Sequence, residues 1–138
     1  GLIETDLGYG KEKDEEGFFR ISYFEGDANY SKGRNWIKIQ GGEEQSVIRI
    51  VSYKDAYFET SFDHKVNSSA YFQMKVSDLN SPPNLIYEYE AVNFSETEKK
   101  YVKSHKKGGN EKNREILIKI VVPANTTVEI TNFKVVSA

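Results

Sequence analysis

Short runs in which apolar and polar residues alternate follow one another along most of this chain. In Trp36–Gln40, for example, the two isoleucines fall on one face, and Trp36, Lys38 and Gln40 fall on the other. Such alternation is typical of half-buried β-strands. About eight runs are recognisable, namely Gly17–Phe24, Trp36–Gln40, Ser46–Tyr53, Ala56–Val66, Ala70–Val76, Asn84–Val92, Arg114–Val122 and Thr127–Val136. No helical period persists for three turns, so the chain is predicted to be all-β.

Turn-forming residues separate these runs. They lie at Gly26–Asn29, Gly41–Gly42, Asn67–Ser69, Asn80–Pro83, Gly108–Asn110 and Pro123–Asn125. Strands at this spacing predict one antiparallel sandwich or barrel over residues 17–138. Residues 1–16 are polar and punctuated by glycines, and they are predicted to be an arm or an edge strand.

The phase of each run predicts which residues face the core. The predicted core positions include Ile48, Ile50, Phe58, Phe62, Val66, Phe72, Met74, Val76, Ile116, Ile118, Ile120 and Val122. The step from Ile130 to Phe133 breaks the period of two, which predicts a β-bulge at Thr131–Asn132. Ser95–Glu98 has the spacing of a helix capping box, but an irregular strand is favoured there because Gly108 and Gly109 soon end the segment.

Composition narrows the class of protein. The chain has 138 residues, of which 38% are hydrophobic and 29% charged, as in a soluble globular domain. A net charge of −2 argues against nucleic acid as a partner, and no apolar run is long enough for membrane insertion. The absence of cysteine excludes disulfides and thiolate metal sites. Because the chain begins with Gly1, we expect a processed or excised piece attached to other domains of a longer polypeptide.

Several short motifs give the chain a family resemblance. They are Phe24-Glu25-Gly26, the Trp36–Gly42 strand and turn, the Tyr57–Val76 hairpin and the final strand Thr127–Val135. Together they resemble the jelly-roll carbohydrate-binding modules of bacterial polysaccharide-degrading enzymes. The resemblance implies an antiparallel two-sheet jelly roll that binds a polysaccharide or oligosaccharide without catalysis. It also implies a secreted or cell-surface module that targets an attached enzyme or surface protein to glycan; we expect it to be a monomer.

Sugar recognition needs flat aromatic area for the ring faces and planar polar groups for the hydroxyls. The predicted outward positions that meet this description are Trp36, Arg49, Tyr53, Tyr57, Tyr71 and Gln73. We therefore predict an open glycan platform containing these residues. Two alternatives stay open: the outward face is covered by the arm or by a neighbouring module, or the chain is a structural or adhesive sandwich that binds a protein partner.

Acidic residues near the start of the chain offer hard oxygen ligands of the kind that calcium takes. They are Asp14–Glu16 and the group Glu25, Asp27 and Asn29. The resemblance implies one structural calcium, and Glu16, Glu25 and Asp27 are its candidate ligands. Zinc is not expected, because the chain has two histidines and no cysteine.

Basic residues gather between residues 99 and 114. They are Lys99, Lys100, Lys103, Lys106, Lys107, Lys112 and Arg114, with His105 among them. A solvated loop is favoured over a surface for an acidic polysaccharide. For catalysis, no spacing singles out a carboxylate pair among Glu59, Asp63, Glu88 and Glu90, and His64 is expected in the interior or at its rim. A lyase or hydrolase is the less favoured alternative.

Overall fold

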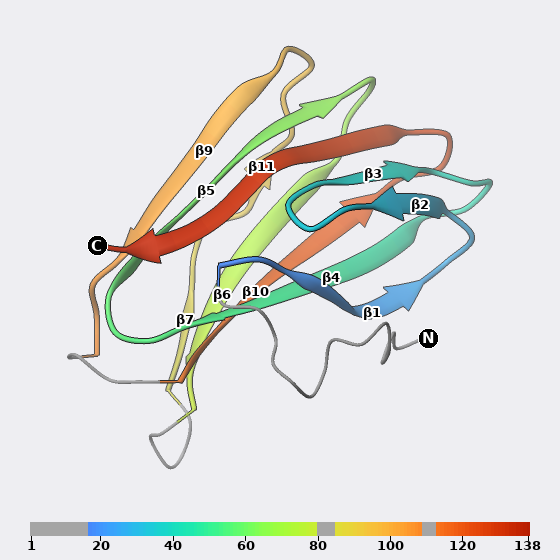
Figure 1. Ribbon diagram of the computed structural model, residues 1–138. Coiled ribbons are helices and arrows are strands. Elements are labelled where there is room, and N and C mark those ends of the chain that lie inside the picture. The colour runs from blue at the N-terminus through green and yellow to red at the C-terminus, as the bar shows by residue number, and fades with distance from the viewer. Residues whose placement is uncertain (1–16, 80–84, 109–112) are drawn as a thin grey trace.

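The computed structural model describes residues 17–79, 85–108 and 113–138, which form two antiparallel sheets (Figure 1). Sheet A has the order β1 (Arg20–Glu25), β4 (Ser46–Lys54), β10 (Arg114–Val122), β6 (Tyr71–Asp78) and β7 (Leu85–Glu88), and β8 (Val92–Asn93) also pairs with β6. Sheet B has the order β2 (Asn29–Lys32), β3 (Ile37–Gln40), β11 (Thr127–Ser137), β5 (Phe58–Val66) and β9 (Lys99–His105). The predicted all-β, two-sheet antiparallel sandwich is confirmed. Among the described residues, no helix is long and apolar enough to cross a membrane.

The inner faces of the two sheets form one hydrophobic core. Phe62 of β5 lies at its centre, with ring centroids 5.1 Å from those of Phe72 and Tyr101 and 6.0 Å from that of Phe133. The Phe72 ring meets Phe62 edge to face and the Phe133 ring stacks on it, and aromatic pairs at such distances stabilise the core beyond the burial of the rings. Every core position predicted from the phase of the runs is buried here. The alternation of the strands therefore fixed the inner faces correctly.

One strand, β2, was not predicted from the sequence, and another, β9, decides between two alternatives that the sequence left open. The predicted turn Gly26–Asn29 overlaps the start of β2. Because the residues of β2 are polar and three of its four are exposed at a sheet edge, apolar and polar residues do not alternate along it. β9 confirms that a strand, not a helix, follows Ser95: the Ser95 hydroxyl accepts a hydrogen bond from the Thr97 amide in a local turn. The predicted arm 1–16 and most of the predicted turns at 80–83 and 108–110 lie outside the described residues.

The predicted bulge in the last strand is confirmed. The register of β11 against β5 shifts between Thr131 and Lys134, and Asn132 adopts a positive φ of 53°. Asparagine tolerates this left-handed conformation better than most residues. The Asn132 side-chain amide donates a hydrogen bond to Asp63 Oδ2 at 2.8 Å, which ties the bulge to β5.

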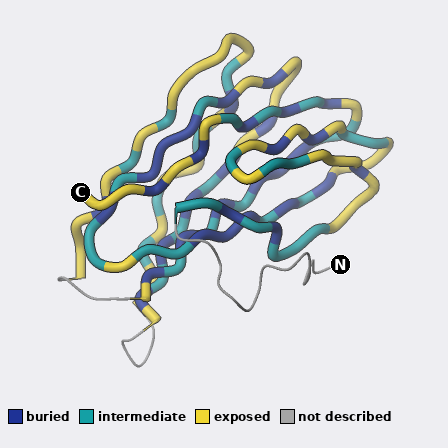
Figure 2. The backbone as a smooth tube through the Cα atoms, viewed as in Figure 1, coloured by how far each residue is buried: buried dark blue, intermediate teal, exposed yellow. Residues whose placement is uncertain are grey.

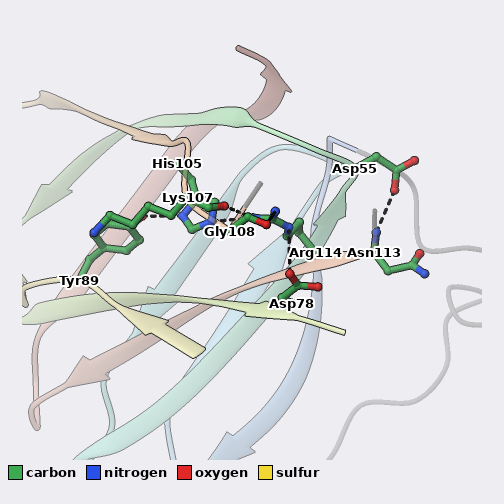
Figure 3. A network of polar contacts seen from close by, with 8 residues as sticks. All are labelled: Asp55, Asp78, Tyr89, His105, Lys107, Gly108, Asn113 and Arg114. Atoms are coloured by element: carbon green, nitrogen blue, oxygen red, sulfur yellow. Dashed lines mark hydrogen bonds and ion pairs between the residues drawn. The ribbon is translucent and has the colours of Figure 1, made fainter. Parts of the chain in front are cut away.

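A buried polar network closes one end of the sandwich (Figure 3). Arg114 at the start of β10 donates from Nη1 to His105 Nε2 at 2.8 Å and to the Lys107 carbonyl oxygen at 2.9 Å. The Arg114 Nε lies 3.9 Å from Asp78 Oδ2 at the end of β6. Tyr89 contacts His105 Nδ1 through its hydroxyl at 2.5 Å. The network thus connects β9 of sheet B with β6 and β10 of sheet A.

The network corrects the interpretation of the basic segment. Arg114 and His105 are fully buried, so they are not available to a polymer at the surface. Lys99, Lys100 and Lys103 belong to strand β9 rather than to a loop, and Lys103 Nζ lies 4.9 Å from the centroid of the Tyr89 ring. Sequence spacing could not show this, because the burial of Arg114 depends on contacts with Asp78 and His105 from other strands.

Candidate functional site

The outer face of sheet A carries the densest group of the predicted ligand residues. Arg49 and Tyr53 lie on β4, and Tyr71 and Gln73 lie on β6, with β10 between the two strands. All four point away from the core, because their strand neighbours Ile48, Ile50, Phe72 and Met74 are buried in it. We call this face the platform; it consists of Tyr23, Arg49, Tyr53, Tyr71, Gln73, Lys75, Glu115 and Lys119, with Val51, Leu117 and Val121 between them.

One row of side chains crosses the middle of the platform. Tyr23 pairs with Arg49, Arg49 pairs with Lys119, and Lys119 pairs with Gln73. Directly opposite residues of antiparallel strands have Cβ atoms roughly 4.5–5.5 Å apart, so these four side chains are neighbours. Arg49 lies with its guanidinium carbon 4.6 Å from the centroid of the Tyr23 ring. The row therefore combines an aromatic ring, two cations and an amide.

The floor of the platform is apolar and sheltered. Val51 and Val121 belong to the outer face, yet only 2% and 5% of their surface is exposed. The strands β4 and β10 contain no exposed residue, whereas outward residues of sheet B such as Lys38, Lys100 and Val136 are exposed (Figure 2). A valine on the outside of a sheet is buried only where its neighbours close over it. The centre of the platform, on β4 and β10, is thus sheltered.

Hydrogen bonds orient the polar groups of the platform. Gln73 donates a hydrogen bond from Nε2 to the Tyr89 carbonyl oxygen at 2.9 Å. This bond fixes the orientation of the amide and leaves the Gln73 Oε1 as an acceptor. Tyr53 donates to Glu115 Oε2 at 3.3 Å. Tyr23 donates to Glu25 Oε1 at 2.6 Å, and this bond is the main cause of a raised pKa of the Tyr23 hydroxyl. Tyr71 presents a ring that is 37% exposed.

Trp36 and Tyr57 do not join the platform, which corrects the expectation of one continuous surface. Trp36 immediately precedes β3 and Tyr57 immediately precedes β5, and both strands belong to sheet B. Trp36 is 39% exposed, as its strand phase predicted, but its indole packs over Gly33. The assignment of residues to one sheet or the other depends on strand order, and the alternation of a single strand contains no information about it.

Sheet B has a pocket of its own on the outer face, with a volume of about 480 Å³. Its lining residues are Phe18, Asn35, Asp63, Lys100, Asn132, Phe133 and Lys134. The Asn132 bulge and its hydrogen bond to Asp63 shape the wall. Polar groups of this kind could also bind a hydroxyl-rich ligand. A variant in this pocket is therefore a suitable control for variants of the platform.

The predicted calcium ligands are not assembled by the described residues. Asp27 accepts hydrogen bonds from the backbone amides of Glu43 at 2.8 Å and Glu44 at 3.2 Å, and these bonds lower the pKa of its carboxyl group. Glu25 accepts the hydrogen bond from Tyr23, and Glu16 lies outside the described residues. Within the described ranges, no group of three or more His, Cys, Asp or Glu residues could hold a metal. Glu25 and Asp27 alone do not make a calcium site.

His64 is an interior residue, as expected. It is 2% exposed, and its Nδ1 accepts a hydrogen bond from the Ser95 amide at 3.2 Å. Burial, followed by the charge of Lys99, lowers the pKa of the His64 ring. A neutral, buried ring with one nitrogen bonded to a backbone donor is a structural histidine. The nearby carboxylates of Asp63 and Glu59 lie on the outer face of sheet B, away from this ring.

Comparisons with solved structures identify the fold. A family 61 carbohydrate-binding module in complex with β-1,4-galactotriose superposes with a TM-score of 0.62 at 12% identity, over 87% of this chain and 88% of that one. A family 4 module gives a TM-score of 0.53 at 15% identity, over 87% and 78% of the two chains. The xylan-binding CBM22-1 domain of Paenibacillus barcinonensis Xyn10C gives 0.53 at 11% identity, over 87% and 86%. No family model and no curated protein matches the sequence. The chain therefore has the jelly-roll fold of these modules, as predicted.

Sequence reasoning missed two members of the central row. Tyr23 and Lys119 both lie at outward positions, and each was overlooked because nothing in its own strand distinguishes it. The outward phase of Lys119 was readable from its neighbour Ile118, which is buried. That of Tyr23 was not, because Tyr23 lies two residues from the buried Ile21 and the register of β1 against β4 shifts between them. Only the pairing of β1 with β4, and of β10 with both β4 and β6, shows that they flank Arg49 and Gln73.

Proposed function

We propose that the platform binds a polysaccharide or oligosaccharide noncovalently, and that the module directs an attached enzyme or surface protein to that glycan outside the cell. The observation that carries the proposal is the row Tyr23–Arg49–Lys119–Gln73 over a buried valine floor, with the exposed Tyr71 ring beside it. Planar polar groups and an aromatic face in one sheltered area match the chemistry of a sugar ring.

Each platform residue has a definable role in this proposal. The Tyr71 ring packs against the C–H face of a sugar, and Gln73 Oε1 accepts a hydrogen bond from a hydroxyl. Arg49 and Lys119 donate to ring substituents, since both carry only donors. Gln73 is preoriented by the Tyr89 carbonyl and Arg49 by the Tyr23 ring, which reduces the entropy lost on binding. Because an open platform leaves part of the ligand solvated, affinity should be modest.

The solved modules with this fold support the proposal by analogy of fold. Family 61 and family 29 modules were obtained in complex with β-1,4-galactotriose and mannohexaose, respectively. A further match is the CBM22-1–GH10 part of a xylanase complexed with xylohexaose. Binding requires no titrating carboxylate pair. The carboxylates of Glu115 on the platform and of Glu25 on β1 accept hydrogen bonds from different tyrosines. The module is accordingly proposed to be non-catalytic.

The test compares the two outer faces by calorimetry against a panel of neutral and acidic polysaccharides. Tyr71→Ala and Gln73→Ala should each weaken binding about tenfold, which corresponds to roughly 1.4 kcal/mol. Asp63→Ala, in the pocket of sheet B, and Trp36→Ala are the matched controls and should bind like the parent protein. The opposite pattern would move the site to sheet B. Failure to bind any glycan would reject the proposal in favour of a sandwich that binds a protein partner.

A further inference from the structure

The charges of the platform are arranged unevenly, with the cations at its centre. Arg49 and Lys119 are direct cross-strand partners, and Lys119 lies between Arg49 and the uncharged Gln73. Like charges placed directly opposite each other destabilise a sheet, so this pair costs folding free energy. Among the described residues, neither Arg49 nor Lys119 forms an ion pair.

Among the described residues, no carboxylate of the same face forms an ion pair with Arg49 or Lys119. Glu115 pairs with Tyr53 and accepts its hydrogen bond, and it is four residues from Lys119 along β10. At about 3.4 Å per residue, that separation is roughly 13 Å along the strand. Glu88 lies on β7 directly opposite Lys75, at the far side of the sheet. Glu25 lies on β1 and accepts the hydrogen bond of Tyr23, whose ring packs against Arg49. The two central cations therefore have carboxylates in their surroundings but no ion-pair partner among the described residues.

The surroundings strengthen the attraction of these cations for an anion. Val51 and Val121 give the platform a floor with little exposed surface, and charges interact more strongly next to apolar, poorly hydrated groups. The Arg49 guanidinium packs against Tyr23, which restricts its conformations, and a guanidinium can bind a carboxylate or sulfate through two parallel hydrogen bonds. Lys119 adds a second positive charge beside it.

Tyr71 places a sugar ring next to this pair. It lies two residues from Gln73 on the same face of β6, roughly 7 Å along the strand, and Gln73 is the partner of Lys119. Building on the proposed glycan-binding function, we infer that the platform selects an anionic glycan, in which a carboxylate or sulfate group binds between Arg49 and Lys119 while the sugar packs on Tyr71.

The experiment measures binding of the full chain to polygalacturonate, to a sulfated galactan, and to the carboxyl-reduced and desulfated forms of the same polymers. At least one acidic polymer should bind ten times more tightly than its neutral form, and raising the salt concentration should weaken that binding. The acidic polymer that binds identifies the anionic group. Equal affinity for both forms would overturn the inference while leaving the proposed function in place, whereas no binding to any polymer would reject both.

Variants separate recognition at this pair from general attraction. Lys119→Gln and Arg49→Gln should each reduce affinity for the acidic polymer about tenfold, and clearly more than they reduce affinity for its neutral form. Lys38→Gln, which removes an exposed charge from the outer face of sheet B, is the matched control and should not reduce binding. Polyglutamate tests for charge alone: binding as tight as that of the acidic polymer would overturn the inference.

Discussion

Arg114 donates a hydrogen bond from Nη1 to Nε2 of His105 across a distance of 2.8 Å, with both side chains fully buried. A guanidinium can only donate, so His105 Nε2 must carry a lone pair. The ring is therefore neutral, its proton lies on Nδ1, and that N–H donates to the Tyr89 hydroxyl oxygen at 2.5 Å. Burial, followed by the charges of Arg114 and Lys107, lowers the pKa of His105 to about 4.

This pKa predicts a loss of stability in acid. The unfolded chain takes up a proton at His105 near pH 6.5, whereas the folded protein resists it down to about pH 4. Stability from this group is present above pH 6.5 and is lost as the pH falls from 6.5 to 4, on the order of 3 kcal/mol in all. Urea denaturation at pH 7 and pH 4.5 measures the loss, and His105→Gln, which keeps an acceptor but does not titrate, should show a smaller one. An NMR titration midpoint near 6.5 for His105 would contradict the assignment.

The ion pair between Arg114 and Asp78 predicts a large effect of removing one partner. Arg114→Met leaves the Asp78 carboxylate buried without its neighbouring positive charge, and it should lower the free energy of unfolding by about 3–5 kcal/mol. Adding Asp78→Asn to this variant should restore part of the loss, because the buried negative charge disappears. Urea denaturation measures both changes, with Arg49→Met as the control on the platform. A double variant less stable than Arg114→Met would contradict this account.

Trp36 predicts a local fluorescence response to a change at Gly33. A Cβ atom on Gly33 would lie only 2.2 Å from Trp36 Nε1, so Gly33→Ala must displace the indole. Because the ring is already 39% exposed, it can move outward with little loss of packing, and its emission should shift to the red. The neighbouring Ser31→Ala should leave the spectrum unchanged. An unaltered spectrum of Gly33→Ala would show that the indole does not cover Gly33.

The placement of Trp36 on sheet B also predicts what a ligand titration will show. If the glycan binds the platform on sheet A, saturating ligand should leave the emission of this single tryptophan unchanged, even where calorimetry records binding. A saturable shift in Trp36 emission would instead place the ligand on sheet B.

The calcium site expected from the family resemblance stays a prediction. Asp27 uses one oxygen for each of the Glu43 and Glu44 amides, but a carboxylate has about four lone-pair positions and can still bind a cation. If a site includes it, calcium should raise the melting temperature relative to EDTA, and Asp27→Ala should abolish the increase. Equal melting temperatures of the parent protein in calcium and in EDTA would contradict the prediction.

The sequence by itself determined the fold class, the inner faces of the sheets and the bulge in the last strand. These follow from a period of two along each strand, which is a local property: Ile39, Phe62 and Met74 are buried apolar residues, and the neighbours of each in the chain are polar. It also determined that Arg49, Tyr53, Tyr71 and Gln73 face outward.

Only the tertiary structure decided which outward residues share a surface. Strand order brings Tyr23, Arg49, Lys119 and Gln73 into one row and places Trp36 and Tyr57 on the other sheet. The burial of Arg114 was likewise decided by the tertiary structure, because it depends on Asp78, which is distant in the chain. Pairing between strands is set by the packing of the whole core, so no single strand contains it. The edge strand β2 was missed because three of its four residues are exposed and it shows no alternation, whereas the long central strands do.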